Sequence, residues 1–318
     1  MTALAFRLFE GDVDLPGMHT VSQVSLIADG MNMLEDFESF SESYSEFSEM
    51  LPAEDVIILE SEDKIIGHAR VWWKKYSGGR RLYSVASFVL PEHSSARREL
   101  IERAELRLAD IASCHPPEVE KAFETQCVGG TPLEGLFRSM GYSLGRTFFE
   151  MVRPLGKTEE KKVPGITIRQ VREDELKTAW SVAREAFRGQ RMFAEENWSE
   201  ERLDAKMRSP FFDITLWYVA CHGDEIVGSV YNYIKPEENQ MLDRRRGYIS
   251  NVCVSGDFRG KGIAKALICK GLRELESRGM KEARLGVDSE NPTGALDLYR
   301  SLGFAVSNSY LSFVKPMK

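Results

Sequence analysis

The residues FRGKGIAKAL (258–267) place two glycines and two cations directly before a helical pattern. Gly260 and Gly262 would let an anion approach the backbone, because neither carries a Cβ. Arg259 and Lys261 add positive charge, and the first turn of a helix presents unpaired N–H groups. The segment therefore predicts a cradle for a pyrophosphate group. A strand-to-helix turn eased by glycine is the alternative interpretation, and the loop alone does not separate the two.

The elements around this loop are those that such a cradle needs. YISNVCV (248–254) is a β-branched strand pattern, and residues 262–278 carry apolar side chains at helical spacing. ARLGV (283–287) predicts the next strand. Asn291 and Pro292 are typical of the first residues of a helix, which Gly303 would end. The loop has neither the Walker spacing nor the GxGxxG of a dinucleotide-binding fold.

The sequence resembles the GNAT superfamily of N-acetyltransferases through two motifs, Arg-x-x-Gly-x-Ala and Asn-x7-Tyr-x3-Gly-Phe. The residues that carry the resemblance are Arg259, Gly262, Ala264, Asn291, Tyr299, Gly303 and Phe304. The resemblance implies acetyl-CoA as co-substrate and direct transfer of the acetyl group to a primary amine of a small molecule or peptide. Neither a metal ion nor a covalent enzyme intermediate is needed for that reaction.

The resemblance also implies roles for individual residues. Tyr299 would donate its proton to the departing thiolate, and the backbone of the strand would bind the pantetheine arm and the thioester carbonyl. Tyr299 as a core aromatic, Asn291 as a helix cap and Cys253 as small core filler are the alternative interpretations. The implied cofactor-binding residues are Val252, Cys253, Val254, Arg259, Gly260, Lys261, Gly262, Ile263, Ala264 and Asn291.

The position of the general base departs from the family pattern. Many members place a glutamate at the start of the strand before the loop, and that position here is Tyr248. A phenol with a pKa of about 10 is a poor base at neutral pH. Water or another carboxylate would then take the proton from the amine. A protein that binds acyl-CoA without catalysis is the competing hypothesis.

Two further groups of charged residues are candidates for substrate contacts. Arg244, Arg245 and Arg246 would suit an acidic substrate or the CoA 3′-phosphate, or else form a solvated loop. Glu195 and Glu196 would hold a substrate amine, or else begin a surface helix.

The composition limits the class of protein. A length of 318 residues suggests two domains, and a net charge of −7 argues against nucleic-acid binding. The N-terminus shows no cleavable signal, and no apolar run approaches the ~20 residues of a membrane span. We therefore expect a cytoplasmic protein without membrane contacts. The cysteines, which have neither disulfide nor metal-site spacing, are Cys114, Cys127, Cys221, Cys253 and Cys269.

The chain repeats itself at a nearly constant offset. Three pairs of segments match in the same order, at offsets of 162, 161 and 162 residues: Arg7 with Arg169, Gly67 with Gly228, and Gly141 with Gly303. The repeat predicts an α/β protein of two tandem GNAT-like domains, 1–153 and 165–318, joined by a linker at 154–164. Each domain would be a mixed, mostly antiparallel sheet flanked by helices.

The first copy lacks the residues that suggest chemistry in the second. Its loop reads SSARREL (94–100) without a glycine, and Phe137 occupies the position of Tyr299. We expect a degenerate domain that supports the fold or shapes the acceptor cleft, with an altered acyl-CoA site as the alternative. The tandem layout is similar to that of the mycothiol synthase family, which acetylates a cysteinyl amine. That acceptor is an alternative substrate here.

Overall fold

The computed structural model describes residues 4–31, 34–44, 50–76, 79–188, 190 and 193–317, apart from the side chain of Glu196. The chain divides into two compact units. Unit 1 comprises Met1–Thr147 and Ser309–Lys318, and unit 2 comprises Phe148–Asn308. Each is an α/β unit with a mixed, mostly antiparallel sheet, so the predicted fold class is confirmed.

The sheet of unit 1 has the strand order β1-β2-β3-β4-β5-β12. β4 and β5 are parallel, and the other neighbours are antiparallel. The strands are β1 (Leu4–Leu8), β2 (Val56–Ser61), β3 (Lys64–Lys75), β4 (Arg81–Val89), β5 (Lys121–Val128) and the end of β12 (Ala305–Pro316). The helices are α1 (Leu15–Ala28), α2 (Phe37–Glu42), α3 (Pro52–Asp55), α4 (Arg97–Ser113) and α5 (Pro132–Ser139).

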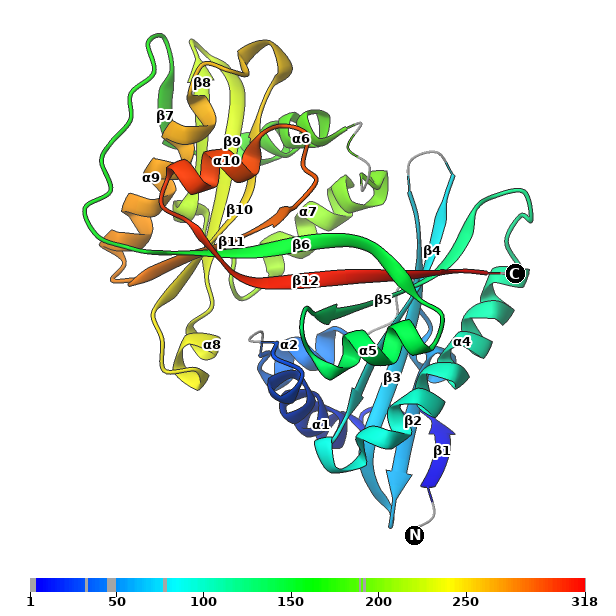
Figure 1. Ribbon diagram of the computed structural model, residues 1–318. Helices are drawn as coiled ribbons and strands as arrows, with labels where there is room; N and C mark the ends of the chain where they lie inside the picture. The colour runs from blue at the N-terminus through cyan, green and yellow to red at the C-terminus, as the bar shows by residue number, and fades with distance from the viewer. Residues whose placement is uncertain are drawn as a thin grey trace. The chain divides into compact units, whose positions relative to one another are not determined.

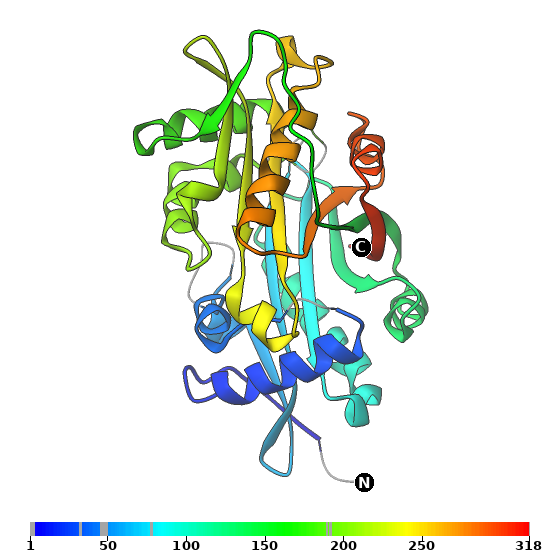
Figure 2. The ribbon, with the colours of Figure 1, turned by 90° about the vertical axis from the view of Figure 1, so that its left-hand side faces the viewer.

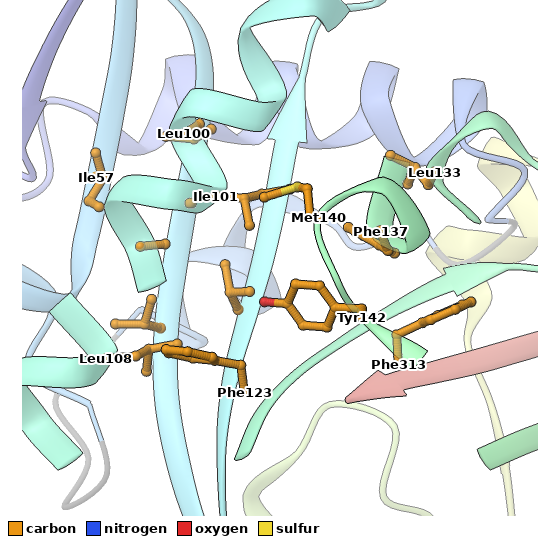
Figure 3. Close-up of a cluster of buried hydrophobic side chains, with 14 of the residues drawn as sticks. Ile57, Leu100, Ile101, Leu108, Phe123, Leu133, Phe137, Met140, Tyr142 and Phe313 are labelled. Carbon is orange, nitrogen blue, oxygen red and sulfur yellow. The ribbon is translucent and has the colours of Figure 1, made fainter. Parts of the chain in front are cut away.

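Alternating side chains on β2 show how helices cover both faces of this sheet. Val56 and Ile58 pack with Leu15 and Met18 of α1, whereas Ile57 packs in the cluster that contains the apolar side of α4. Figure 3 shows this second cluster, in which Leu100, Ile101 and Leu108 of α4 gather with Phe123, Phe137 and Phe313.

The sheet of unit 2 has the strand order β6-β11-β10-β9-β8-β7 (Figure 1). β10 and β11 are parallel, and each of the other pairs of neighbouring strands in this sheet is antiparallel. The strands are β6 (Ser143–Pro154), β7 (Thr167–Gln170), β8 (Trp217–His222), β9 (Glu225–Ile234), β10 (Arg246–Val254) and β11 (Glu282–Asp288). The helices are α6 (Leu176–Phe187), α7 (Glu200–Arg208), α8 (Pro236–Met241), α9 (Ile263–Ser277) and α10 (Ala295–Ser301). α9 lies along β9 and β10 (Figure 2).

The chain passes from one unit to the other inside strands. β6 begins in unit 1, but its residues 148–154 pair with β11 of unit 2. β12 begins in unit 2, but its residues 310–316 pair with β5 of unit 1. Each half of the sequence therefore gives its last strand to the sheet of the other half.

Because of this exchange, the residue bounds of the two units differ from those of the predicted domains. The predicted linker at 154–164 follows β6, whereas the compact unit already begins at Phe148. The repeat indicates where each copy ends, but it does not indicate which sheet the last strand joins. The predicted boundaries 1–153 and 165–318 therefore differ from the units by the exchanged strands and by the linker, which lies inside unit 2.

The two parallel strands of unit 2 separate along their length. Residues 246–248 of β10 pair with residues 282–284 of β11, yet β10 continues to Val254 and β11 to Asp288. A β-bulge interrupts β10 between Ser250 and Cys253, where Asn251 has a φ of +48°. Bulges are frequent beside active sites, where they re-aim a side chain or end the strand pairing. The separation forms a wedge that is open toward the predicted loop.

Candidate active site

The wedge of unit 2 opens into a cavity of about 780 Å³. Its walls come from β10, the loop before α9, β11 and α10. Of the predicted catalytic and cofactor-binding residues, Lys261 alone does not line the cavity, and its ammonium lies 4.8 Å from the ring centroid of Phe258. The fold brings the others together: Tyr248, Val252, Cys253, Val254, Arg259, Gly260, Gly262, Ile263, Ala264, Asn291 and Tyr299.

The glycine loop has the open backbone that its sequence predicts. Gly260 and Gly262 adopt φ values of +76° and +81°, in the left-handed region that favours glycine. No described atom lies within 4 Å of the position that a Cβ would take at either residue. Within the described part of the chain, no side chain caps α9, which begins at Ile263. Its first N–H groups are therefore available to an anion.

Arg259 braces this loop. Its Nε donates to the carbonyl of Val254 at 3.2 Å, and its Nη2 donates to the carbonyl of Ala186 at 3.0 Å. These bonds tie the loop to the end of β10 and to α6. Arg259 thus has a structural role that the sequence pattern alone does not reveal.

Cys253 is buried in the strand and forms part of its packing. Its Sγ lies 3.2 Å from Ser229 Oγ, and burial raises the pKa of the thiol above its ordinary value. The thiol is therefore protonated at neutral pH, as the interpretation of Cys253 as core filler expects.

Tyr299 projects from α10 into the wall of the cavity. Its ring lies 6.1 Å from that of Phe304, and burial raises the pKa of its hydroxyl to about 12. No residue that the structure describes forms a hydrogen bond with this hydroxyl. At neutral pH it is a protonated donor without a hydrogen-bond partner among the described residues.

Asn291 closes a turn instead of starting a helix. Its Oδ1 accepts hydrogen bonds from the backbone N and the Oγ1 of Thr293, at 2.9 and 2.5 Å. α10 begins at Ala295, after Gly294 with a φ of +73°. The predicted helix start at Asn291–Pro292 was wrong, because the Asn291 side chain favours a local turn over the helix.

Tyr248 lies at the closed end of the wedge and belongs to a buried polar cluster. Its hydroxyl donates to Glu238 Oε2 at 2.7 Å and accepts from Arg244 Nη2 at 3.2 Å. Arg244 also forms an ion pair with Glu238. Burial and the bond to Glu238 raise the pKa of Tyr248 above its ordinary value. The phenol therefore stays protonated at neutral pH, and Glu238 is the nearest carboxylate behind it.

Nothing in the local sequence around Glu238 marks it as a site residue. It follows Pro236 and Glu237 in a short acidic segment that looks like any exposed helix start. Only the turn of α8 back toward β10 buries its side chain, to 3% exposure, against Tyr248.

Internal ion pairs account for two of the three consecutive arginines. Arg244 contacts Glu238, as above, and Arg246 donates from Nε to Glu282 at 2.6 Å. Arg245 is exposed. The triplet is therefore mainly structural.

Glu195, in the acidic pair before α7, does not line the cavity. Glu195 is exposed and lies 3.5 Å from Arg184 and 3.3 Å from Arg188. The side chain of Glu196 lies outside the described residues. Glu195 thus fits the surface-helix interpretation.

The family model described as the acetyltransferase (GNAT) family matches residues 179–304, which lie inside unit 2 and contain the loop, the wedge and Tyr299. Unit 2 is a GNAT acetyltransferase domain. The match covers less than half of the chain, and unit 1 lies outside it. None of the helices in the described ranges combines the length and apolar character needed to cross a bilayer.

Curated relatives named mycothiol acetyltransferase match a large part of the chain. One from Streptomyces bingchenggensis is 29% identical over 195 residues, which are 58% of this chain and 59% of the relative. One from Geodermatophilus obscurus is 25% identical over 259 residues, 79% of this chain and 78% of the relative. The first match thus spans less than two thirds of the relative's length.

Solved structures share the fold. A GCN5-related N-acetyltransferase from Sphaerobacter thermophilus aligns with a TM-score of 0.76 at 22% identity, covering 98% of this chain and 95% of that one. A tandem GNAT protein from the clavulanic acid biosynthesis pathway aligns with a TM-score of 0.71 at 14% identity, covering 99% and 98%.

Proposed function

We propose that unit 2 transfers the acetyl group of acetyl-CoA to a primary amine by direct attack. The observation that carries this proposal is the cavity that the two-glycine loop, the bulged strand and the free hydroxyl of Tyr299 share. An anion cradle, a backbone wedge and a proton donor are the parts that the reaction needs.

The residues of this cavity suit the parts of acetyl-CoA. The N–H groups from Arg259 to Ala264 would hold the pyrophosphate, because the loop is open and uncapped there. The backbone of Val252, Cys253 and Val254 would bind the pantetheine arm, since β10 has already separated from β11 at those residues. Acetyl-CoA would supply an activated acetyl group as its thioester.

Tyr299 is the proton donor in this proposal. Its hydroxyl remains protonated, because its pKa is raised to about 12, and no described protein group competes for its hydrogen. It would donate to the sulfur as negative charge develops there, and the second proton that the amine nitrogen loses as the amide forms would restore the Tyr299 phenol.

Tyr248 and Glu238 form the proton-accepting side. The Tyr248 proton is directed to Glu238, and Arg244 takes one lone pair of the oxygen. The remaining lone pair can accept a hydrogen bond from a substrate ammonium. We propose that the ammonium gives its proton to the Tyr248 oxygen while Tyr248 passes its own proton to Glu238. The amine becomes neutral and nucleophilic, and Glu238 becomes neutral.

Thiol release from acetyl-CoA in the presence of a panel of primary amines tests the proposed activity. The expected result is amine-dependent release with one equivalent of N-acetylated product per thiol. The competing function, a non-catalytic acyl-CoA-binding protein, predicts that CoA binds while no amine accelerates release.

The named relatives favour one amine in such a panel. Their curated name suggests the cysteinyl amine that becomes acetylated in mycothiol. The desacetyl precursor should therefore be included beside simple amines. A higher kcat/KM for this precursor than for free cysteine would support that acceptor.

A further inference from the structure

Unit 1 contains a cavity of about 190 Å³ at the position that corresponds to the wedge of unit 2. Tyr83 of β4 lies opposite Trp73, as Tyr248 of β10 lies opposite Tyr233. Ser84–Phe88, which line the unit 1 cavity, therefore correspond to Ile249–Cys253 in the wall of the unit 2 cavity.

The unit 1 cavity lacks the features that suit CoA. The residue before α4 is Ala96 with a φ of −79°, in place of a left-handed glycine. β4 pairs regularly with β3 from Arg81 to Val89, so the bulge is missing. Phe137 lies at the position of Tyr299 and is buried in the core (Figure 3). This cavity fits a ligand without pyrophosphate.

The loop beside the cavity is closed by a buried guanidinium. Arg97 is 4% exposed, and its Nη1 donates to Asp29 Oδ2 at 2.8 Å. Its Nη2 donates to Ser25 Oγ at 2.9 Å and to the carbonyl of Val89 at 3.2 Å. The charge of Asp29, which also lines the cavity, is thereby neutralised within the protein.

Glu124 is a carboxylate of the cavity wall with different surroundings. It is 7% exposed and accepts hydrogen bonds from Ser84 Oγ at 3.0 Å and Ser312 Oγ at 2.9 Å. Among the described residues, no lysine, arginine or histidine forms an ion pair with it. Most of the remaining wall is apolar or aromatic, including Leu26, Trp72, Val85, Phe88, Leu133 and Phe137. Unit 2 has Leu285 where unit 1 has Glu124, by the same strand pairing.

A buried carboxylate bonded only to hydroxyls lacks a counter-charge, and its desolvation is costly. Aromatic faces attract cations, and an apolar cavity of about 150 Å³ is large enough for benzene. We propose that unit 1 binds a small organic cation, a primary ammonium on an apolar or aromatic group, with Glu124 as its counter-ion. This site is independent of the acetyl transfer proposed for unit 2.

Calorimetry on the full chain with benzylamine and its neutral analogue benzyl alcohol tests this site. We expect benzylamine to bind. Benzyl alcohol should bind at least about tenfold more weakly, because it cannot form the charge-assisted hydrogen bond. Glu124→Gln keeps an acceptor for the two serine hydroxyls but removes the negative charge. It should therefore lower the affinity for benzylamine by a similar factor. The matched control is Glu120→Gln, because Glu120 is exposed on the same unit and pairs with Arg80.

A second variant tests the location of the site by filling the cavity with a larger side chain. Ala86 lines the cavity from β4, so Ala86→Leu should exclude benzylamine while leaving Glu124 in place. Thermal melts check that the variants fold. The proposal is overturned if the unaltered chain does not bind benzylamine, or if Glu124→Gln and Ala86→Leu bind it as well as the unaltered chain does. The latter result would place the amine elsewhere, for example in the acceptor region of unit 2.

Discussion

Tyr299 and Tyr248 both line one cavity, but their hydroxyls have opposite surroundings. Tyr299 has no hydrogen-bond partner among the described residues, whereas Tyr248 donates to Glu238 and accepts from Arg244. The first can give a hydrogen to a ligand, and the second can receive one. This difference is the physical basis for assigning the leaving thiolate to Tyr299 and the amine to Tyr248.

Tyr299→Phe should lower kcat by about 10²-fold, because the proton donor is lost. The affinity for CoA should change little, since the ring still packs against Phe304. Steady-state kinetics and CoA calorimetry on the same preparation check both values. An equal loss of turnover and affinity would remove Tyr299 from the role of donor.

Glu238→Gln should lower kcat/KM for the amine by about 10²-fold near neutral pH, because Tyr248 can no longer pass on its proton. The loss should shrink as the pH rises, since free amine is then already present. The control is Glu237→Gln, an exposed neighbour on the same helix. A loss that is constant across the pH range would indicate a purely structural role for Glu238.

His68 predicts a pH dependence of stability. It is fully buried between Ser22 Oγ at 2.8 Å and the Tyr44 hydroxyl at 3.3 Å, and burial lowers its pKa to about 3. The unfolded chain protonates this imidazole below about pH 6.5. The stability is therefore full above pH 6.5 and is lost as the pH falls toward 3. His68→Gln should flatten the fall of Tm with pH, whereas His222→Gln, at an exposed position, should not.

Among the elements, the loop before α9 is where sequence and structure agree most closely. Glycines, a preceding strand and a following helix are local features, so their spacing predicts the backbone conformation. The start of α10 was mispredicted, because Asn291 and Gly294 form a turn that competes with the helix signal of Pro292. Glu238 was missed because its contact with Tyr248 joins two elements whose approach depends on the whole sheet.

Gly262→Ala tests whether the loop binds CoA, and Gly279→Ala is the matched control. Gly262 and Gly279 have φ values of +81° and +79°, and no described atom crowds a Cβ at either position. Each alanine should cost about 1–2 kcal/mol of stability, from the left-handed backbone. Calorimetry should show weaker CoA binding for Gly262→Ala alone. Equal CoA affinities for the two variants would argue against the cradle.

For the molecule as a whole, the repeat predicts two similar folds but not the exchange of their last strands. Strand pairing between distant segments leaves no local signal, because either copy of the closing strand carries the same apolar pattern. The exchange has an energetic consequence in unit 2. Glu150 on β6 accepts from Arg284 Nε at 2.6 Å and lies 3.7 Å from Arg246 Nη1.

A fragment of residues 148–308 should therefore fold and bind CoA, whereas a fragment of residues 163–318 should be much less stable. The second fragment lacks the strand that pairs with β11 and leaves Arg284 without Glu150. Thermal melts and CoA calorimetry compare the two. Equal stability of both fragments would show that β6 contributes little to unit 2.

We propose that this protein has one working acetyl-CoA site, in unit 2. A crystal structure of the full chain with CoA tests it most directly. The predicted result is a pyrophosphate bonded to the N–H groups between Arg259 and Ala264, with the sulfur within hydrogen-bond reach of Tyr299. Pyrophosphate bound in unit 1 beside Arg97, or a sulfur remote from Tyr299, would contradict it.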